Sequence, residues 1–128
     1  MNLLLDTHIL LRAASGVDLG DRLRRLLEDP ANRLVFSAAS IWEIAIKSGL
    51  GRPDFDVPSG VFRRGLLEAG YEELPVTGAH AAALQALPPL HRDPFDRILV
   101  AQALVESLTL VTADRMILTY PGPVLAAP

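Results

Sequence analysis

Short apolar segments alternate along the chain with longer segments whose apolar residues recur at helical spacing. The short segments are typical of strands and occupy residues 3–5, 34–36, 71–76, 108–112 and 124–125. The longer ones predict helices over 7–14, 18–29, from Ser37 or Ser40 to Gly49 or Gly51, from Val57 or Ser59 to Ala69, 78–87 and 94–107. Short apolar strands separated by helices predict a parallel sheet that helices cover on both faces. In such α/β folds, ligands bind beyond the carboxyl ends of the strands.

The length and composition predict one folded domain over residues 1–128. Half of the residues are apolar and 21% are charged, and no repeat or linker divides the chain. The chain has no cysteine. This excludes a disulfide framework, a thiolate zinc site, an iron–sulfur cluster and a cysteine nucleophile. The single tryptophan, Trp42, is predicted to belong to the core.

The distribution of charge argues against a membrane protein. The longest stretch without Asp, Glu, Lys or Arg is 74–91, and histidine, glycine and proline residues interrupt it. The amino terminus reaches Asp6 before any basic residue, unlike a signal peptide. We therefore expect a soluble, cytoplasmic protein.

The net charge of −3 is unusual for a protein that binds nucleic acid by electrostatics alone. However, eleven of the twelve cations are arginines, which suit bidentate contacts with phosphate. A metal ion would also change the working charge of an acidic site. Nucleic acid therefore stays open as a partner.

Four acids are expected at one edge of the predicted sheet. Asp6 ends the first strand, and Asp114 follows the strand 108–112 by two residues. Glu43 lies among apolar residues of the helix after the second strand, and Asp96 opens the most apolar helix. Three of these positions are at the carboxyl end of a strand or the amino end of a helix.

Each acid also has an ordinary explanation when it is considered alone. Asp6 and Asp114 can cap the segments that follow them, and Glu43 has the spacing of a helix ion pair with Lys47. Asp96 fits the N3 position of a capped helix. Together they are harder to explain, because carboxylates about 4 Å apart repel by roughly 4 kcal/mol at an effective dielectric constant of about 20. Mg²⁺ or Mn²⁺ would remove that repulsion.

Other catalytic motifs are weak or absent. The three histidines, His8, His80 and His91, lack the spacing of metal ligands, and His80 is interpreted as exposed or satisfied by hydrogen bonds. Residues 6–8 stand where a Gly-rich phosphate loop would follow the first strand, which argues against nucleotide binding. The sequence has no Gly-x-Ser-x-Gly elbow.

Four segments resemble motifs of PIN-domain ribonucleases, and among these the VapC-type toxins of bacterial toxin–antitoxin pairs. They are 3–8 (LLLDTH), 37–44 (SAASIWEI), 91–103 (HRDPFDRILVAQA) and 110–114 (LVTAD). They occur in the expected order and span the chain, and the two middle motifs are specific.

The resemblance implies a three-layer α/β/α fold with a short parallel central sheet. It also implies an endoribonuclease that hydrolyses RNA phosphodiester bonds with a water activated by Mg²⁺ or Mn²⁺. Carried over position by position, Asp6, Glu43, Asp96 and Asp114 match the acidic quartet of the family. Asp6 and Asp96 match its principal metal ligands, and Glu43 and Asp114 would complete the site.

Other polar residues are expected to support the acids. Asp93 is interpreted first as a helix cap and second as a contact behind the metal ligands. Ser40 and Thr112 are candidates for hydrogen bonds to the acids or to a phosphate. Two cations, Arg97 and Lys47, are candidates for contacts with RNA phosphates or with neighbouring acids.

The family also implies a homodimer and a cognate VapB-type antitoxin whose C-terminal segment would block the active-site groove. The predicted helices 18–29 and 59–69 carry leucine-rich faces beside arginines, which supports such a partner. Ordinary amphipathic packing is the alternative explanation.

Two other functions stay open. One is another metal-dependent phosphate enzyme, such as a nuclease that acts on DNA or a phosphatase. A phosphatase that forms an aspartyl phosphate usually has a second aspartate two residues after the first, where this chain has His8. The other is a non-catalytic interaction module whose acids bind arginines of a partner.

Overall fold

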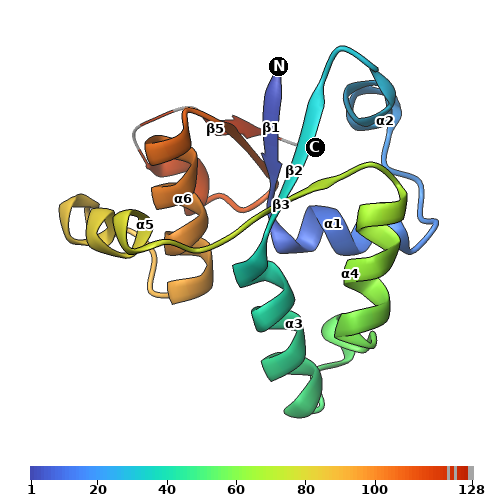
Figure 1. Ribbon diagram of the computed structural model, residues 1–128, viewed down its shortest axis with the longest axis horizontal. Helices are drawn as coiled ribbons and strands as arrows, with labels where there is room; N and C mark the ends of the chain where they lie inside the picture. Colours follow the sequence, from blue (N-terminus) through green and yellow to red (C-terminus); the bar gives the residue numbers. More distant parts are fainter. Residues whose placement is uncertain (121, 123, 127–128) are drawn as a thin grey trace.

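A parallel sheet forms the centre of the computed structural model, which describes residues 1–120, 122 and 124–126 (Figure 1). Five strands among these residues have the order β3-β2-β1-β4-β5. They are β1 (Asn2–Leu5), β2 (Arg33–Ser37), β3 (Glu72–Leu74), β4 (Thr109–Thr112) and β5 (Val124–Ala126). Leu4 of the central strand β1 is in register with Val35 of β2 and with Leu110 of β4.

Helices cover both faces of this sheet. The α-helices among the described residues are α1 (Thr7–Ala14), α2 (Asp21–Glu28), α3 (Ala38–Gly49), α4 (Ser59–Glu68), α5 (Gly78–Ala83) and α6 (Pro94–Glu106). Three short 3₁₀ helices, Pro53–Phe55, Leu84–Ala86 and Ile117–Thr119, complete the connections. In Figure 1, α5 and α6 lie on one side of the strands and α1, α2 and α4 lie on the other. The predicted three-layer α/β/α fold is confirmed.

The alternation of side chains along β1 separates the core into two layers. Leu3 and Leu5 pack with residues of α1, α2, α3 and α4, including Phe62. Leu4 packs on the opposite face with residues of α6, including Leu99. Because helices cover both faces, the side chains of residues 3–5 are all buried, which explains why this part of β1 is apolar throughout, whereas Asn2 at its start is exposed. No helix in the described ranges is long and apolar enough to cross a membrane.

Several elements are shorter than the sequence predicts. The helix expected over 78–87 is α-helical only to Ala83 and continues as the 3₁₀ helix Leu84–Ala86. Two others are shortened for local reasons. The helix expected from residue 18 begins at Asp21, because Gly20 adopts φ +80 and the carboxylate of Asp18 accepts a hydrogen bond from its N–H. The strand expected to reach residue 76 ends at Leu74, and the next residue, Pro75, has no N–H to donate to the sheet.

The prediction that Trp42 belongs to the core is wrong, because its side chain is 62% exposed. α3 buries Ser40, Glu43 and Ile44 instead, and Trp42 lies outside that face. Its indole packs edge-on against the ring of Phe95, with the ring centroids 5.1 Å apart. The buried face of α3 contains polar side chains, so hydrophobicity alone does not identify it.

Candidate functional site

Asp6 lies directly after β1, at the edge where the carboxyl ends of the central strands meet. Its Oδ1 accepts a hydrogen bond from the N–H of Ile9 at 2.8 Å and so caps α1. Its Oδ2 accepts a hydrogen bond from the hydroxyl of Thr112, at the end of β4. Burial raises the pKa of Asp6, although these two bonds act to lower it, and the charge of Asp114 adds to the rise.

Thr112 connects Asp6 to Asp114. Its Oγ1 donates to Asp6 and accepts a hydrogen bond from the N–H of Asp114 at 3.0 Å. Oδ1 of Asp114 accepts bonds from the N–H groups of Met116 and Ile117, as expected of a cap. Partial burial acts to raise the pKa of Asp114, but these bonds and a contact with His91 outweigh it, so the pKa is lowered.

His91 joins Asp114 to Asp96. Its Nε2 lies 3.1 Å from Oδ2 of Asp96 and 3.3 Å from Oδ2 of Asp114. Its Nδ1 accepts a hydrogen bond from the N–H of Asp93 at 3.0 Å. The backbone N–H of His91 donates a hydrogen bond to the hydroxyl of Tyr120 at 2.9 Å. Sequence spacing gave no reason to place His91 in the site, although it lies within the motif at residues 91–103.

The carboxyl group of Asp96 is strongly perturbed. Burial raises the pKa of Asp96 to about 7, and the charges of Asp93 and Glu43 add to the rise. His91 acts in the opposite direction. Asp96 is therefore protonated in about half of the molecules near neutral pH unless a cation neutralises its charge.

Glu43 is the most deeply buried of the four acids, with 1% of its surface exposed. Its Oε2 lies 2.5 Å from Nζ of Lys47, whereas its Oε1 has no hydrogen-bond partner among the described residues. Lys47 also lies 3.3 Å from Oδ2 of Asp93. Burial acts to lower the pKa of Lys47, but the two carboxylates outweigh it and raise the pKa.

The other predicted site residues make structural contacts. Oδ1 of Asp93 accepts a hydrogen bond from the backbone of α6, which confirms the predicted helix cap. Ser40 accepts a hydrogen bond from the hydroxyl of Thr7 at 2.9 Å and has no hydrogen bond to an acid. The guanidinium of Arg97 donates to the carbonyl of Leu84 at 3.2 Å. His80 is buried and hydrogen-bonded, so it is satisfied rather than exposed.

The donors in this centre fit a hard divalent cation. His91, Asp96 and Asp114 each offer a ligand atom, and these atoms lie within 4.8 Å of one another. Asp6 and Glu43 lie outside that group, but the charge of Asp114 acts on Asp6 and the charge of Glu43 acts on Asp96. The unpartnered Oε1 of Glu43 is a buried oxygen of the kind that a cation would satisfy. Carboxylate oxygens predominate, which suits Mg²⁺ or Mn²⁺.

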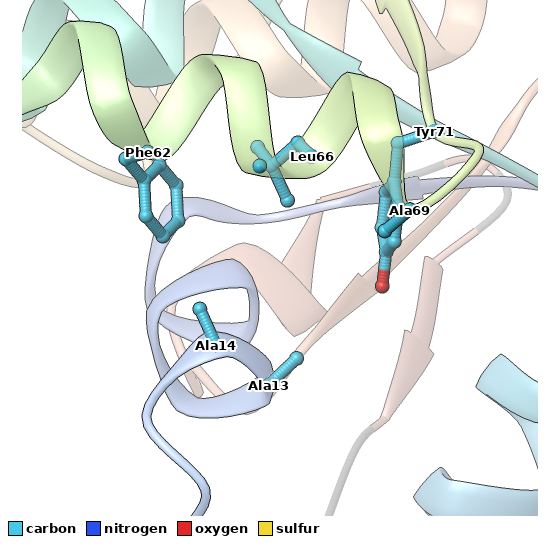
Figure 2. A pocket seen from close by; sticks show the side chains of 7 residues that line it. Ala13, Ala14, Phe62, Leu66, Ala69 and Tyr71 are labelled. Carbon is cyan, nitrogen blue, oxygen red and sulfur yellow. The ribbon is translucent and has the colours of Figure 1, made fainter.

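An apolar groove lies between α1 and α4 (Figure 2). The groove has two parts, with volumes of about 330 Å³ and about 200 Å³. Ala14 and Phe62 line both parts. Figure 2 shows Phe62 and Leu66 of α4 pointing toward Ala13 and Ala14 of α1, with Tyr71 at one end.

A second apolar hollow, of about 280 Å³, lies where α3, α5 and α6 meet. It is lined by Ala39, Trp42, Val76, Ala81, Leu84, Pro94, Phe95 and Ile98. The exposed indole of Trp42 therefore belongs to a continuous apolar surface rather than standing alone.

Comparisons with known proteins agree on the fold. The family model described as PIN domain matches residues 3–122. A comparison with curated protein sequences finds no match. Among solved structures, VapBC2 from Rickettsia felis bound to a DNA fragment from their promoter has a TM-score of 0.75 at 15% identity, over 100% of each chain. A toxin–antitoxin complex from Klebsiella pneumoniae has a TM-score of 0.66 at 18% identity, over 98% of each chain. VapBC-1 from nontypeable Haemophilus influenzae has a TM-score of 0.63 at 20% identity, over 98% of each chain.

Proposed function

Because the chain belongs to the PIN domain family, we propose that it is a metal-dependent endoribonuclease and the toxin of a toxin–antitoxin pair. One observation supports this most strongly: a continuous series of contacts joins acids from four separate segments. Asp6 is linked through Thr112 to Asp114, and Asp114 is linked through His91 to Asp96. Glu43 joins the series through Lys47, which also contacts Asp93, and the backbone N–H of Asp93 donates to His91.

In this proposal, Asp6 and Asp96 are the principal ligands of Mg²⁺ or Mn²⁺, and Glu43 and Asp114 complete the site. A bound ion of this kind supplies an activated water and stabilises negative charge on a phosphodiester. The protein buries Asp6, Glu43 and Asp96, so water screens these three carboxylates little, whereas Asp114 is partly exposed. The hydroxyl of Thr112 orients Asp6 from behind.

The proposed substrate is single-stranded or looped RNA in the cytoplasm, cut by one nuclease domain over residues 1–128. Exposed bases can turn outward into a groove, whereas a duplex hides them. Lys47 and Arg97 already bind a carboxylate and backbone carbonyls, respectively, which weakens both as phosphate contacts. Arg92 is exposed and next to His91, so it is the better candidate.

The nuclease proposal is tested with the protein purified alone and matched single-stranded RNA and DNA of one sequence. Cleavage of RNA should require Mg²⁺ or Mn²⁺, stop with EDTA, and fall at least about 100-fold in Asp6→Asn and in Asp96→Asn. Asp54→Asn, which changes an exposed acid paired with His8, is the matched control. It should cleave as the wild type does.

The alternatives give different results in the same assay. Cleavage that survives chelation would contradict the metal-dependent mechanism. Equal cleavage of DNA would favour a nuclease without RNA specificity. If Mg²⁺ raises the melting temperature but neither nucleic acid is cut, the acids serve a non-catalytic interaction module instead.

The proposed partners are a VapB-type antitoxin and a second copy of the chain. The three structural neighbours named above are toxin–antitoxin assemblies by their descriptions. The groove between α1 and α4 offers an apolar surface for a segment of the antitoxin. The hollow around Trp42 offers a separate apolar surface for the homodimer. The two surfaces are lined by different residues, so the two interactions can be tested separately.

A further inference from the structure

The two ring nitrogens of His91 have different neighbours. Nδ1 lies 3.0 Å from the backbone N–H of Asp93. A backbone N–H can only donate, so Nδ1 accepts this bond and carries no proton. A neutral imidazole has one proton, which is therefore on Nε2. The local backbone thus selects one tautomer of His91.

This tautomer places a donor beside two carboxylates. Nε2 lies 3.1 Å from Oδ2 of Asp96 and 3.3 Å from Oδ2 of Asp114. Ionised carboxylates only accept hydrogen bonds, so Nε2–H donates to Asp114, and the same nitrogen lies in close contact with Asp96. A metal ligand would need a lone pair on Nε2 instead. Histidines that bind metals usually donate from their other nitrogen, but here that nitrogen accepts.

The position of His91 is fixed from a second direction. Its backbone N–H donates to the hydroxyl of Tyr120 at 2.9 Å, and Tyr120 is buried. Tyr120 directly follows the 3₁₀ helix Ile117–Thr119, at the end of the segment that Asp114 begins and caps. The segment that begins at Asp114 and ends at Tyr120 is therefore bonded to His91 at both of its ends.

We propose that His91 is a positioning residue whose Nε2–H holds Asp114 against Asp96, and that it is not a ligand of the metal. The inference rests on the proposed function, because it concerns how that ion is held. The two carboxylates repel each other when both are ionised, and the N–H that His91 donates to Asp114 offsets part of that repulsion. The proposal assigns the coordination of the ion to oxygen atoms, with His91 behind two of the carboxylates.

Three variants and Mn²⁺ as the probe distinguish a donor from a ligand. His91→Gln keeps an N–H at the end of the side chain, and His91→Leu removes it. His8→Gln is the control for the loss of a histidine, because His8 is exposed, its ion pair is with Asp54, and none of its contacts among the described residues is a hydrogen bond to the four acids. Free Mn²⁺ measured by electron paramagnetic resonance gives the affinity, and electron spin-echo modulation detects a directly bound ¹⁴N.

We expect no modulation from a bound imidazole nitrogen in the wild type. The affinity for Mn²⁺ should fall about tenfold in His91→Leu, and His91→Gln should recover most of it. The His8→Gln control should bind Mn²⁺ as the wild type does. A modulation present in the wild type and lost in His91→Gln would show that His91 is a ligand and overturn the inference. Unchanged affinity in His91→Leu would overturn it as well.

The metal-free protein supplies an independent measurement. Imidazole ¹⁵N–¹H spectra at about pH 8, where an ordinary imidazole is neutral, should show the proton of His91 on Nε2. A proton on Nδ1 would overturn the inference even if Mn²⁺ binds. If the wild type binds no Mn²⁺ at all, the proposed metal-dependent function fails, and the spectra still decide whether His91 is the donor.

Discussion

The ammonium group of Lys47 lies 2.5 Å from Oε2 of Glu43, and the two side chains are only 16% and 1% exposed. Nζ of Lys47 also lies 4.8 Å from the centroid of the Phe55 ring and 5.6 Å from that of the Phe95 ring. Acids and aromatic faces therefore surround this cation. The pair occupies one oxygen of Glu43 and leaves Oε1 without a partner among the described residues.

Removal of this cation should destabilise the protein. Lys47→Met leaves the buried carboxylate of Glu43 without its counter-charge, which typically costs about 3–5 kcal/mol. Urea unfolding near neutral pH measures the loss. The double variant Lys47→Met/Glu43→Gln is the control and should recover most of the stability, because it buries no charge. Equal instability of the single and double variants would contradict this account.

The stability of the metal-free protein should depend on pH through Asp96. Its pKa is about 7 in the folded protein and 3.8 in a reference state. Unfolding therefore releases a proton between about pH 4 and pH 7, and the free energy of unfolding falls as pH rises, by up to about 1.4 kcal/mol per pH unit. Below about pH 4 the folded and unfolded states both hold the proton of Asp96. Above about pH 7 neither state holds it, and the stability that this proton contributes at low pH is completely lost.

The difference between two proteins isolates this effect. Asp96→Asn should lack this part of the pH dependence and should be more stable than the wild type near pH 8 in EDTA. Thermal unfolding at a series of pH values measures both curves. Parallel curves for the two proteins would show that the pKa of Asp96 is not raised. Added Mn²⁺ should stabilise the wild type more than Asp96→Asn.

Thr112 should be needed for both stability and nuclease activity. Thr112→Val keeps the shape of the side chain but removes the bond to Asp6 and the acceptor for the N–H of Asp114. Loss of these bonds in a buried site should cost about 1–3 kcal/mol. RNA cleavage should also fall, since Asp6 loses its orientation. Thr112→Ser retains the hydroxyl and should restore activity; if Val and Ser behave alike, the hydroxyl has no such role.

The two apolar surfaces should respond separately to a new charge. Trp42→Glu should convert a dimer into a monomer in analytical ultracentrifugation, because it places a charge in the hollow at α3, α5 and α6. Val61→Glu changes an exposed residue that lines the smaller part of the groove between α1 and α4. It should weaken binding of a coexpressed antitoxin without changing the dimer. Each variant is the control for the other, and an exchange of the two effects would reverse the assignment of the surfaces.

The sheet and the acidic edge were predictable because their signals are local. A strand covered on both faces must be apolar throughout, and a residue directly after such a strand lies at its carboxyl end. Asp6 follows β1 directly, and Asp114 follows β4 by two residues. The cap at Asp93 was also visible, since it depends on the Pro94 that follows it.

The roles of His91 and Trp42 were not predictable, because tertiary contacts decide them. His91 reaches Tyr120, 29 residues along the chain, and Asp114, 23 residues along. No spacing within its own segment records these contacts. Trp42 is exposed because α3 turns the carboxylate of Glu43 inward, and a hydrophobicity pattern assumes the opposite.

The bond between Asp6 and Thr112 joins positions that are 106 residues apart, although β1 and β4 are neighbours in the sheet. A ribosome therefore synthesises Thr112 well after Asp6. Until β4 emerges, the nascent polypeptide lacks one flank of its middle strand and one wall around Asp6. Under the proposed function, a fragment that lacks β4 has no assembled acidic centre and should not cleave RNA.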